Sequence, residues 1–170
     1  MVIMSLASQY LLLLACSQRK YTEPALLPAL ERYDGGNYRL LRKAQREGYF
    51  PNNLDVLILS AKYGLIMSTS CIPYYDQRMN QQQAATLKPQ VMETLQTIGT
   101  QKAYKEIYVE LGRDYMEAID DLAKIFPEAT IIYAQGRIGM RLANLKRWLM
   151  GIQQNSDENV IRRLNGSILR

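Results

Sequence analysis

Histidine is absent from the 170-residue sequence, and that absence excludes more chemistry than any other feature of its composition. Histidine is the commonest metal ligand and the usual proton acceptor beside a nucleophilic serine or cysteine. Ser/His and Cys/His nucleophile pairs, histidine general bases and histidine-ligated metals are therefore excluded. Any catalysis must use carboxylates, lysine, tyrosine, cysteine or the backbone.

Cysteines and long apolar runs are also scarce. The two cysteines, Cys16 and Cys71, have a spacing that fits no zinc pattern, so we expect neither a metal nor another cofactor. No apolar stretch approaches the roughly 20 residues that span a bilayer, and the N-terminus has neither the basic leader nor the apolar region of a secretory signal. We expect a cytoplasmic protein without a membrane partner, in which the two cysteines form no disulfide.

The length of the chain is that of one ordinary domain. Hydrophobic residues make up 48% of the sequence and charged residues 22%, which is typical of a globular protein. The net charge is +5 and the pI is near 9.2, which is compatible with a nucleotide or nucleic-acid partner without requiring one.

Four short apolar runs, each followed by a cation, predict the fold. They occupy residues 11–15, 56–59, 107–111 and 131–134. The helical patterns between them cover residues 38–47, 82–98, 114–126 and 138–150. This alternation favours an α/β fold, specifically a three-layer α/β/α sandwich with a mainly parallel, Rossmann-like sheet of four or more strands.

Two details of the helices can be predicted. Asp114 and Glu117 have the spacing of a capping pair at the start of the third helix. Pro89 would either kink the second helix or lie in its first turn. Residues 68–80 have no period and predict a long loop.

The chain divides into a single domain at residues 1–150 and a tail at residues 151–170. In the tail we expect a polar loop at residues 153–158, followed by a short amphipathic helix. The apolar side of that helix would pack on the domain or on a second copy of the chain, which makes a homo-oligomer one of the expected assemblies.

Cations gather where the predicted strands end. The carboxyl ends of parallel strands share one edge of the sheet, and open α/β sheets bind their ligands at that edge. We expect an anionic partner there, because five cations follow the four apolar runs: Arg19, Lys20, Lys62, Arg113 and Arg137.

The turn after the first run holds a candidate nucleophile. Cys16 lies near two cations, which would favour its thiolate form, although a small cysteine at a strand end could also be a packing residue. Ser17 could donate a hydrogen bond to a phosphate or a base. Lys20 could bind a phosphate or, if desolvated, act as a neutral amine.

The turn after the second run suits a nucleoside. Lys62 offers a cation for phosphate, Tyr63 a ring for stacking, and Ser60 a hydroxyl for a base edge or ribose. Gly64 permits the positive φ that a tight turn requires. The alternative is an ordinary strand-to-helix turn without a ligand.

Two carboxylates are candidates for acid/base chemistry. Asp76, beside Tyr75, could be a general base or could simply pair with Arg78. Glu110 ends the third run, where a buried carboxylate must meet a cation or reach solvent. Three glycines would let the backbone and helix N-termini approach an anion at this edge: Gly112, Gly136 and Gly139.

The predicted helix at residues 38–47 has one basic side. Its cations follow the i, i+3, i+4, i+7 pattern and comprise Arg39, Arg42, Lys43 and Arg46. They form either a solvated outer face or a contact surface for a nucleic-acid backbone.

These motifs resemble a family of small, largely uncharacterised bacterial domains with a Cys-Ser-x-x-Lys turn, a Ser-Ala-Lys-(Tyr or His)-Gly-Leu turn and a Pro-Tyr-Asp-like loop. The family is similar in turn to the core domain of archaeosine synthase, which modifies a deazaguanine base in tRNA, and to domains attached to tRNA-guanine transglycosylase-like proteins. The resemblance covers roughly residues 10–150. Its matching positions are Cys16, Ser17, Lys20, Ser60, Ala61, Lys62, Gly64, Leu65, Tyr75, Asp76, Gly112, Tyr115, Gly136 and Gly139. It implies a nucleobase or nucleic-acid site, with Tyr75 and Tyr115 near the substrate, and leaves the reaction open.

The leading hypothesis is a metal-independent, enzyme-like domain that acts on a nucleotide, a nucleoside or a base in nucleic acid. Lys20 and Lys62 would hold phosphate, Asp76 or Glu110 would act as acid or base, and Cys16 is the candidate nucleophile. A transferase, lyase or glycosidase type of reaction fits these groups. The alternatives are a non-catalytic nucleic-acid-binding module that uses the basic helix and a scaffold for another partner.

Overall fold

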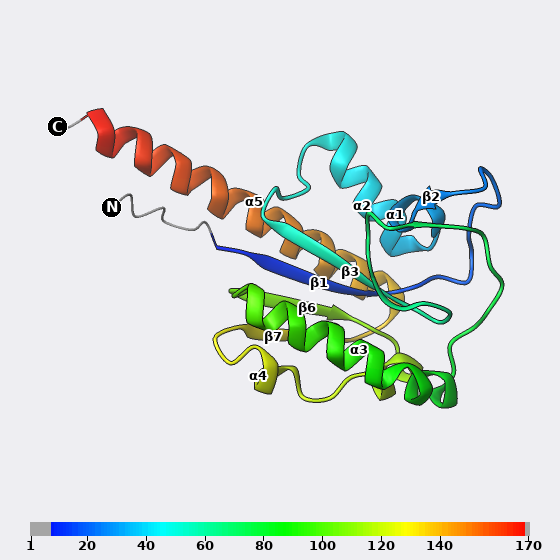
Figure 1. The fold of residues 1–170 in the computed structure, drawn as a ribbon. Helices are drawn as coiled ribbons and strands as arrows, with labels where there is room; N and C mark the ends of the chain where they lie inside the picture. Colours follow the sequence, from blue (N-terminus) through cyan, green and yellow to red (C-terminus); the bar gives the residue numbers. More distant parts are fainter. Residues whose placement is uncertain (1–7, 169–170) are drawn as a thin grey trace.

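A five-stranded sheet lies at the centre of the computed structural model, which describes residues 8–168 and the side chains as far as residue 166 (Figure 1). The strand order is β4-β3-β1-β6-β7. Four strands run parallel, namely β1 (Tyr10–Ala15), β3 (Leu54–Ser60), β6 (Glu106–Glu110) and β7 (Thr130–Tyr133). Strand β4 (Gly64–Met67) is antiparallel to β3. The prediction of a mainly parallel sheet is confirmed.

Helices cover both faces of this sheet, as predicted for a three-layer sandwich. Helix α2 (Gly36–Glu47) packs with α5 (Ile138–Ile168) on one face. Helix α3 (Gln81–Gln101) packs on the other face, together with the 3-10 helix η1 (Arg113–Ala118) and α4 (Leu122–Ile125). Strand β1 is central, and Leu11, Leu12 and Leu14 are fully buried. Burial on both faces explains why this strand is an apolar run without alternation.

The predicted third helix is divided in two. Residue 114 does not cap it, because η1 begins after Gly112 without a side-chain cap and ends before Ile119, whose backbone is extended. A new helix, α4, then starts at Asp121, whose side chain accepts a hydrogen bond from the backbone N–H of Ala123. Asp121, and not Asp114, therefore supplies the capping carboxylate.

In the second predicted helix, Pro89 lies in the interior of α3, so its placement in the first turn is wrong. The helix begins earlier than predicted because the Asn80 side chain caps it by accepting from the backbone N–H of Gln83.

The predicted polar loop in the tail is wrong, because α5 continues without interruption from Ile138 to Ile168. Residues 153–158 contain no proline, and two side chains bond within the helix: Gln153 donates to Asp157 and Ser156 donates to the carbonyl of Ile152. The red end of α5 extends past the sheet in Figure 1. The start of the tail packs on the domain, where Ile152 is buried, whereas three apolar side chains further along are more than half exposed: Val160, Ile161 and Leu164. The side chain of Ile168 and residues 169–170 lie outside the described residues.

No helix in the described part of the chain is both long enough and apolar enough to cross a membrane.

A buried arginine holds the segment between β1 and α2 in place. Arg32 is completely buried at the end of the short helix α1 (Ala29–Arg32). Its guanidinium donates to the backbone carbonyls of Tyr21, Pro24, Ala25 and Ile72. Ile72 belongs to β5 (Cys71–Ile72), which pairs with β2 (Leu27–Pro28). Strand β5 lies within residues 68–80, which the sequence predicts to be only a loop. Arg32 therefore ties two distant loops together.

A second charged centre fixes the start of α2. Asp34 is 4% exposed, and Arg19, Arg39 and Arg42 all lie within ion-pair distance of its carboxylate. Hydrogen bonding from Arg39 is the main cause that lowers the pKa of Asp34 from 3.8 to about 2. Arg42 also donates to the carbonyls of Leu30 and Tyr33.

This network changes the interpretation of the basic helix face. Arg39 and Arg42 are bound to Asp34, and Lys43 lies 3.8 Å from Glu47. Three of the four predicted contact cations are therefore paired with acids of the same chain. Asp34 lies just before the helix and Glu47 is its last residue, and both are within reach of the basic side.

Arg32→Lys tests the first of these two centres. Lysine keeps the charge, but a single ammonium cannot reach all of the carbonyls that the guanidinium holds. We expect the free energy of unfolding, measured with urea, to fall by about 3 kcal/mol, since buried acceptors lose their donors. Arg46→Lys, on the exposed side of α2, is the matched control and should change stability by less than about 0.5 kcal/mol. An Arg32→Lys protein as stable as this control would show that the carbonyl contacts contribute little.

Asp34→Asn tests the second centre. We expect a loss on the order of 3 kcal/mol at neutral pH, because three cations lose their buried counter-charge. The pKa of Asp34 is lower in the folded chain than in the unfolded chain, so its contribution is present above pH 4 and is lost as the pH falls towards 2. Urea unfolding at several pH values should therefore show the two proteins converging in acid. Asp120→Asn, in the exposed pair with Lys88, should have little effect at any pH.

Candidate functional site

A cavity opens where the connections of two neighbouring strands diverge. The chain leaves β1 towards α2 on one face of the sheet and leaves β6 towards η1 on the other. Ligands of open α/β sheets bind at such a point. The cavity here has a volume of about 320 Å³. The polar side chains in its lining are Cys16, Ser17, Asn37, Glu110, Tyr115 and Arg141.

Glu110 is the buried carboxylate of this cavity. It is 5% exposed, and both Nε and Nη2 of Arg141 lie 2.7 Å from its Oε1. Its Oε2 is buried and has no hydrogen-bond partner among the described residues. Burial raises the pKa of Glu110, and the guanidinium of Arg141 opposes that rise only in part. Of the two alternatives expected for Glu110, a cation or solvent, the structure shows a cation, but it is Arg141 and not one of the five cations expected at this edge.

Cys16 lies beside a tyrosine hydroxyl at the end of β1. Its Sγ is 3.3 Å from the hydroxyl of Tyr115, which is also 3.2 Å from the Cys16 carbonyl oxygen. The pKa of Tyr115 is raised by burial, with the nearby Cys16 acting in the same direction. The thiol is mostly buried but lines the cavity, so only a molecule inside the cavity could reach it.

The hydroxyl of Ser17 is already used within the fold. It donates to the carbonyl of Arg19 at 2.6 Å and accepts from the backbone N–H groups of Asp34 and Gly35. Ser17 therefore shapes the turn before α2, and the predicted donation to a phosphate or base would cost an existing bond. Gly35 is required there, since a Cβ would lie 2.9 Å from the Cβ of Ser17.

Two lysines converge on one aromatic ring. Nζ of Lys20 is 4.5 Å from the ring centroid of Tyr75, and Nζ of Lys62 is 5.8 Å from it. No carboxylate of the described residues lies within ion-pair distance of either ammonium. Burial lowers the pKa of Lys20, while the charges of Cys16 and Asp76 act against this. The two lysines form a local excess of positive charge.

Hydroxyl groups behind this ring hold it in place. The hydroxyl of Tyr75 lies 2.6 Å from that of Tyr33 and 2.8 Å from Oγ of Ser60. Ser60 is fully buried and also accepts from the backbone N–H groups of Lys62 and Tyr63. Burial raises the pKa of Tyr33 to about 12 and that of Tyr75 further, so both hydroxyls stay protonated. The Ser60 hydroxyl is therefore enclosed behind Tyr75 and bonded within the protein, and its predicted contact with a base edge or ribose would cost one of these bonds.

The other residues of this turn lie nearer the surface. The ring of Tyr63 packs edge-on against Tyr75, with centroids 5.4 Å apart. Gly64 has a φ of +71°, as predicted for the turn, and Gln90 fills the space where a side chain would be. Asp76 is exposed and does not line the cavity at β1 and β6.

The predicted convergence of five cations is only partly correct. Lys20 and Lys62 meet at Tyr75, whereas Arg19 turns to Asp34. The remaining two cations, Arg113 and Arg137, are exposed, and neither lines the cavity. Arg113 is the first residue of η1, and Arg137 directly precedes α5. They differ from the lysines because they start helical segments whose buried sides point away from them.

The glycines have three different roles. Gly112 lines the cavity and directly precedes η1. Gly136 has a φ of +92° just before α5, as its turn requires. Gly139 lies inside the first turn of α5, where it is exposed.

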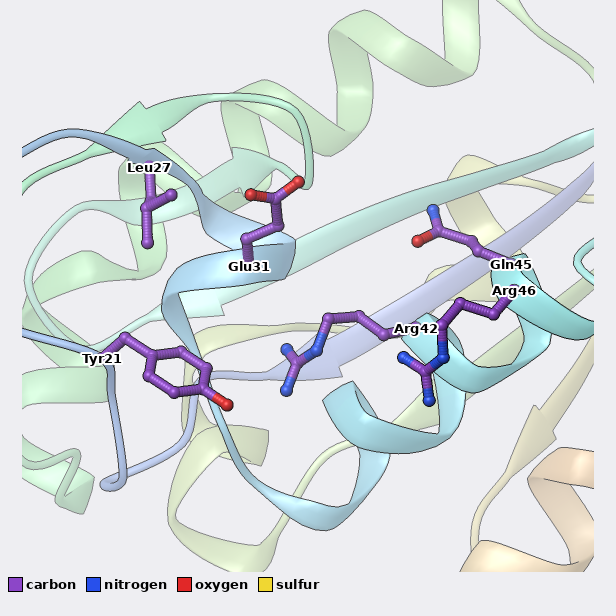
Figure 2. A pocket seen from close by; sticks show the side chains of 6 residues that line it. All are labelled: Tyr21, Leu27, Glu31, Arg42, Gln45 and Arg46. Atoms are coloured by element: carbon purple, nitrogen blue, oxygen red, sulfur yellow. The ribbon is translucent and has the colours of Figure 1, made fainter. Parts of the chain in front are cut away.

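A second depression lies between the segment before α1 and helix α2, as Figure 2 shows. It is open, with a volume of about 500 Å³, and the ring of Tyr21 lies 5.8 Å from the guanidinium carbon of Arg42. Its lining comprises Tyr21, Leu27, Glu31, Arg42, Gln45 and Arg46. Arg42 is committed to Asp34 and to backbone carbonyls, so Arg46 is the cation of this groove that forms no ion pair with the described residues.

Sequence reasoning missed Arg141 and Asn37 as site residues. Arg141 lies one turn after the start of α5, which places it at the sheet edge. Asn37 follows two glycines in the first turn of α2, a position typical of ligand contact in this fold. Among the described residues, no three acidic or cysteine side chains come together as a metal site would require.

Comparison with known proteins identifies the fold and the family. No curated protein matches the sequence. A solved structure titled "Crystal structure of AF0587, a protein of unknown function" is similar at a TM-score of 0.51 and 15% identity, a likeness that concerns the fold alone. The match covers 84% of this chain and 44% of that one, so the chain spans less than half the length of that protein. The model of a family described as a family of unknown function (DUF6884) matches residues 11–147, and the chain therefore belongs to that family.

Proposed function

We propose that the chain is an enzyme-like domain that acts on a nucleotide, a nucleoside or a base in nucleic acid. The base occupies the cavity at the ends of β1 and β6, and Lys20 and Lys62 hold a phosphate beside it. The observation that carries this proposal is the pair of lysines that face one buried ring without a carboxylate partner, next to a cavity with a buried acid.

The lysine pair supports a phosphate ligand. Both ammonium groups lie near Tyr75, whose ring is held by the bonds of its hydroxyl to Tyr33 and Ser60. An anion placed between the two lysines would attract both charges. An anion would also offset the partial burial of Lys20, since an opposite charge favours the charged form of an amine.

The cavity supports a flat heterocycle. Its volume of about 320 Å³ is at the small end of the range for ligand sites. The walls combine tyrosine rings and aliphatic groups with a few polar atoms, which is the usual composition of such sites. Cys16 links the two parts, because it lines the cavity and lies close enough to Lys20 and Tyr75 to interact with them electrostatically.

The groups at the cavity can carry out acid/base and covalent chemistry. A buried carboxylate whose pKa is raised by its surroundings is a candidate for moving a proton, and this describes Glu110. Cys16 is the candidate nucleophile. Both roles fit the resemblance to the archaeosine synthase core, which implies chemistry on a base, and a transferase, lyase or glycosidase reaction remains the class to test.

The second candidate is a non-catalytic nucleic-acid-binding module. The observation that favours it is the groove of Figure 2, where an exposed tyrosine ring lies beside Arg42 and Arg46. Pairing of Arg39, Arg42 and Lys43 with acids weakens this candidate, because a phosphate backbone would have to compete with Asp34 and Glu47.

Lys62→Ala tests the enzyme-like proposal. A ligand that binds only the folded chain raises its Tm, so nucleotides, nucleosides, deazaguanine bases and short RNA and DNA are screened by thermal shift. We expect a nucleoside monophosphate to stabilise the wild type and to bind Lys62→Ala about tenfold more weakly or worse, since a hydrogen bond to a charged group contributes roughly 1.5–3 kcal/mol.

Lys105→Ala is the matched control. Lys105 is exposed just before β6, at the opposite end of the strands, so its removal should leave binding unchanged. Stabilisation by oligonucleotides alone, insensitive to Lys62→Ala and lost at higher salt, would contradict the proposal and favour the binding module.

A further inference from the structure

One oxygen of Glu110 has no partner inside the protein. Oε1 receives the Arg141 guanidinium at 2.7 Å, whereas Oε2 is buried and accepts no hydrogen bond from the described residues. A buried acceptor without a hydrogen bond destabilises the folded chain. Groups of this kind in folded proteins call for an explanation, and a ligand site is one of the principal explanations.

The donors around the cavity are already committed. The hydroxyl of Tyr38 donates to the carbonyl of Ala15, and Nη2 of Arg141 donates to that of Leu111. The hydroxyl of Ser17 donates to Arg19, and that of Tyr115 contacts Cys16. The Asn37 amide is close enough to lower the pKa of Glu110 slightly but forms no hydrogen bond of good geometry with Oε2. Apart from Asn37, these side-chain donors are engaged within the protein, so an N–H group of a ligand can complete the hydrogen bonding of Oε2.

We propose that Oε2 of Glu110 accepts a hydrogen bond from the edge of the bound base. The cavity therefore prefers a ring that presents an N–H donor, as an amino group or a protonated ring nitrogen, over the same ring without one. This inference rests on the proposed function, because it assigns the specificity of the same cavity.

The neighbouring charge favours a neutral donor over a cation. The guanidinium of Arg141 lies against the carboxylate, so a metal ion or an ammonium group at Oε2 would meet a positive charge at short range. A neutral N–H group gains the hydrogen bond without that repulsion. Arg141 also fixes the orientation of the carboxylate, so Oε2 keeps its direction when the cavity is empty.

The test compares nucleotides that differ only in the donor. Adenosine 5′-monophosphate and inosine 5′-monophosphate carry an N–H donor on the six-membered ring, whereas purine riboside 5′-monophosphate carries none. Ribose and phosphate are the same, so the contribution of the lysines cancels. We expect the better of the two donor-bearing nucleotides to bind the wild type at least about tenfold more tightly in calorimetric titrations, since a site built around a hydrogen bond strongly rejects the analogue that lacks it.

Glu110→Gln is the matched variant. The Arg141 guanidinium requires an acceptor, so the amide oxygen takes the place of Oε1 and the NH2 group takes the place of Oε2. The cavity then presents a donor instead of an acceptor, and the preference for the donor-bearing nucleotides should disappear or reverse. Its thermal melting shows whether the variant is folded, and the comparison within the wild type stands without it.

The outcomes separate this inference from the proposed function. Equal binding of all three nucleotides to the wild type, with affinity still dependent on Lys62, would overturn the role of Glu110 and leave the phosphate site intact. An unchanged preference in folded Glu110→Gln would overturn it as well. Failure of every nucleotide to stabilise the wild type would overturn the proposed function itself, and the inference with it.

Discussion

The divergence of the chain at the ends of β1 and β6 is the constraint on which the rest of the structure depends. Because β1 is buried on both faces, it can carry no polar side chain along its length, and its first polar residues come where it ends. The connection to α2 and the connection to η1 then leave on opposite faces, so no side chain of the sheet closes the space between them. Cys16, Glu110 and the first turns of α2 and α5 meet at this opening.

Among the residues that the structure describes, four with polar or charged side chains are buried besides the tyrosines and Cys16, and three of them are satisfied by the protein. Arg32 donates to backbone carbonyls, Asp34 receives three arginines, and Ser60 bonds two backbone N–H groups and Tyr75. Each of these three therefore has a structural explanation. Glu110 has a partner for one oxygen only, although it lies among the same strand ends. That contrast distinguishes it as a ligand contact more clearly than its burial does, because burial alone is shared by all four.

The sequence was sufficient to predict the parallel sheet and the edge where the cavity lies, since buried strands are apolar runs and polar residues must follow them. It was also sufficient to require a cation or solvent for Glu110. It could not identify Arg141 as the cation, because the two are distant in the chain. The same limit applies to Arg39 and Arg42: the 3.6-residue period places them on one side of a helix but does not reveal that Asp34 lies there. The continuous α5 was missed because a run of polar residues is compatible with a solvated helix as well as with a loop.

Several cations near the candidate site are paired with acids of the same chain. Binding to a nucleic-acid backbone releases counterions in proportion to the phosphates neutralised, so it needs several free cations along one surface. Here Arg19, Arg39 and Arg42 share Asp34, and Arg141 is bound to Glu110. Lys20 and Lys62, by contrast, face one ring without an acid beside them. Two cations at one point fit a single phosphate better than a chain of phosphates. The distribution of charge therefore favours a small nucleotide, or one base taken out of a longer strand, over a duplex lying across the surface.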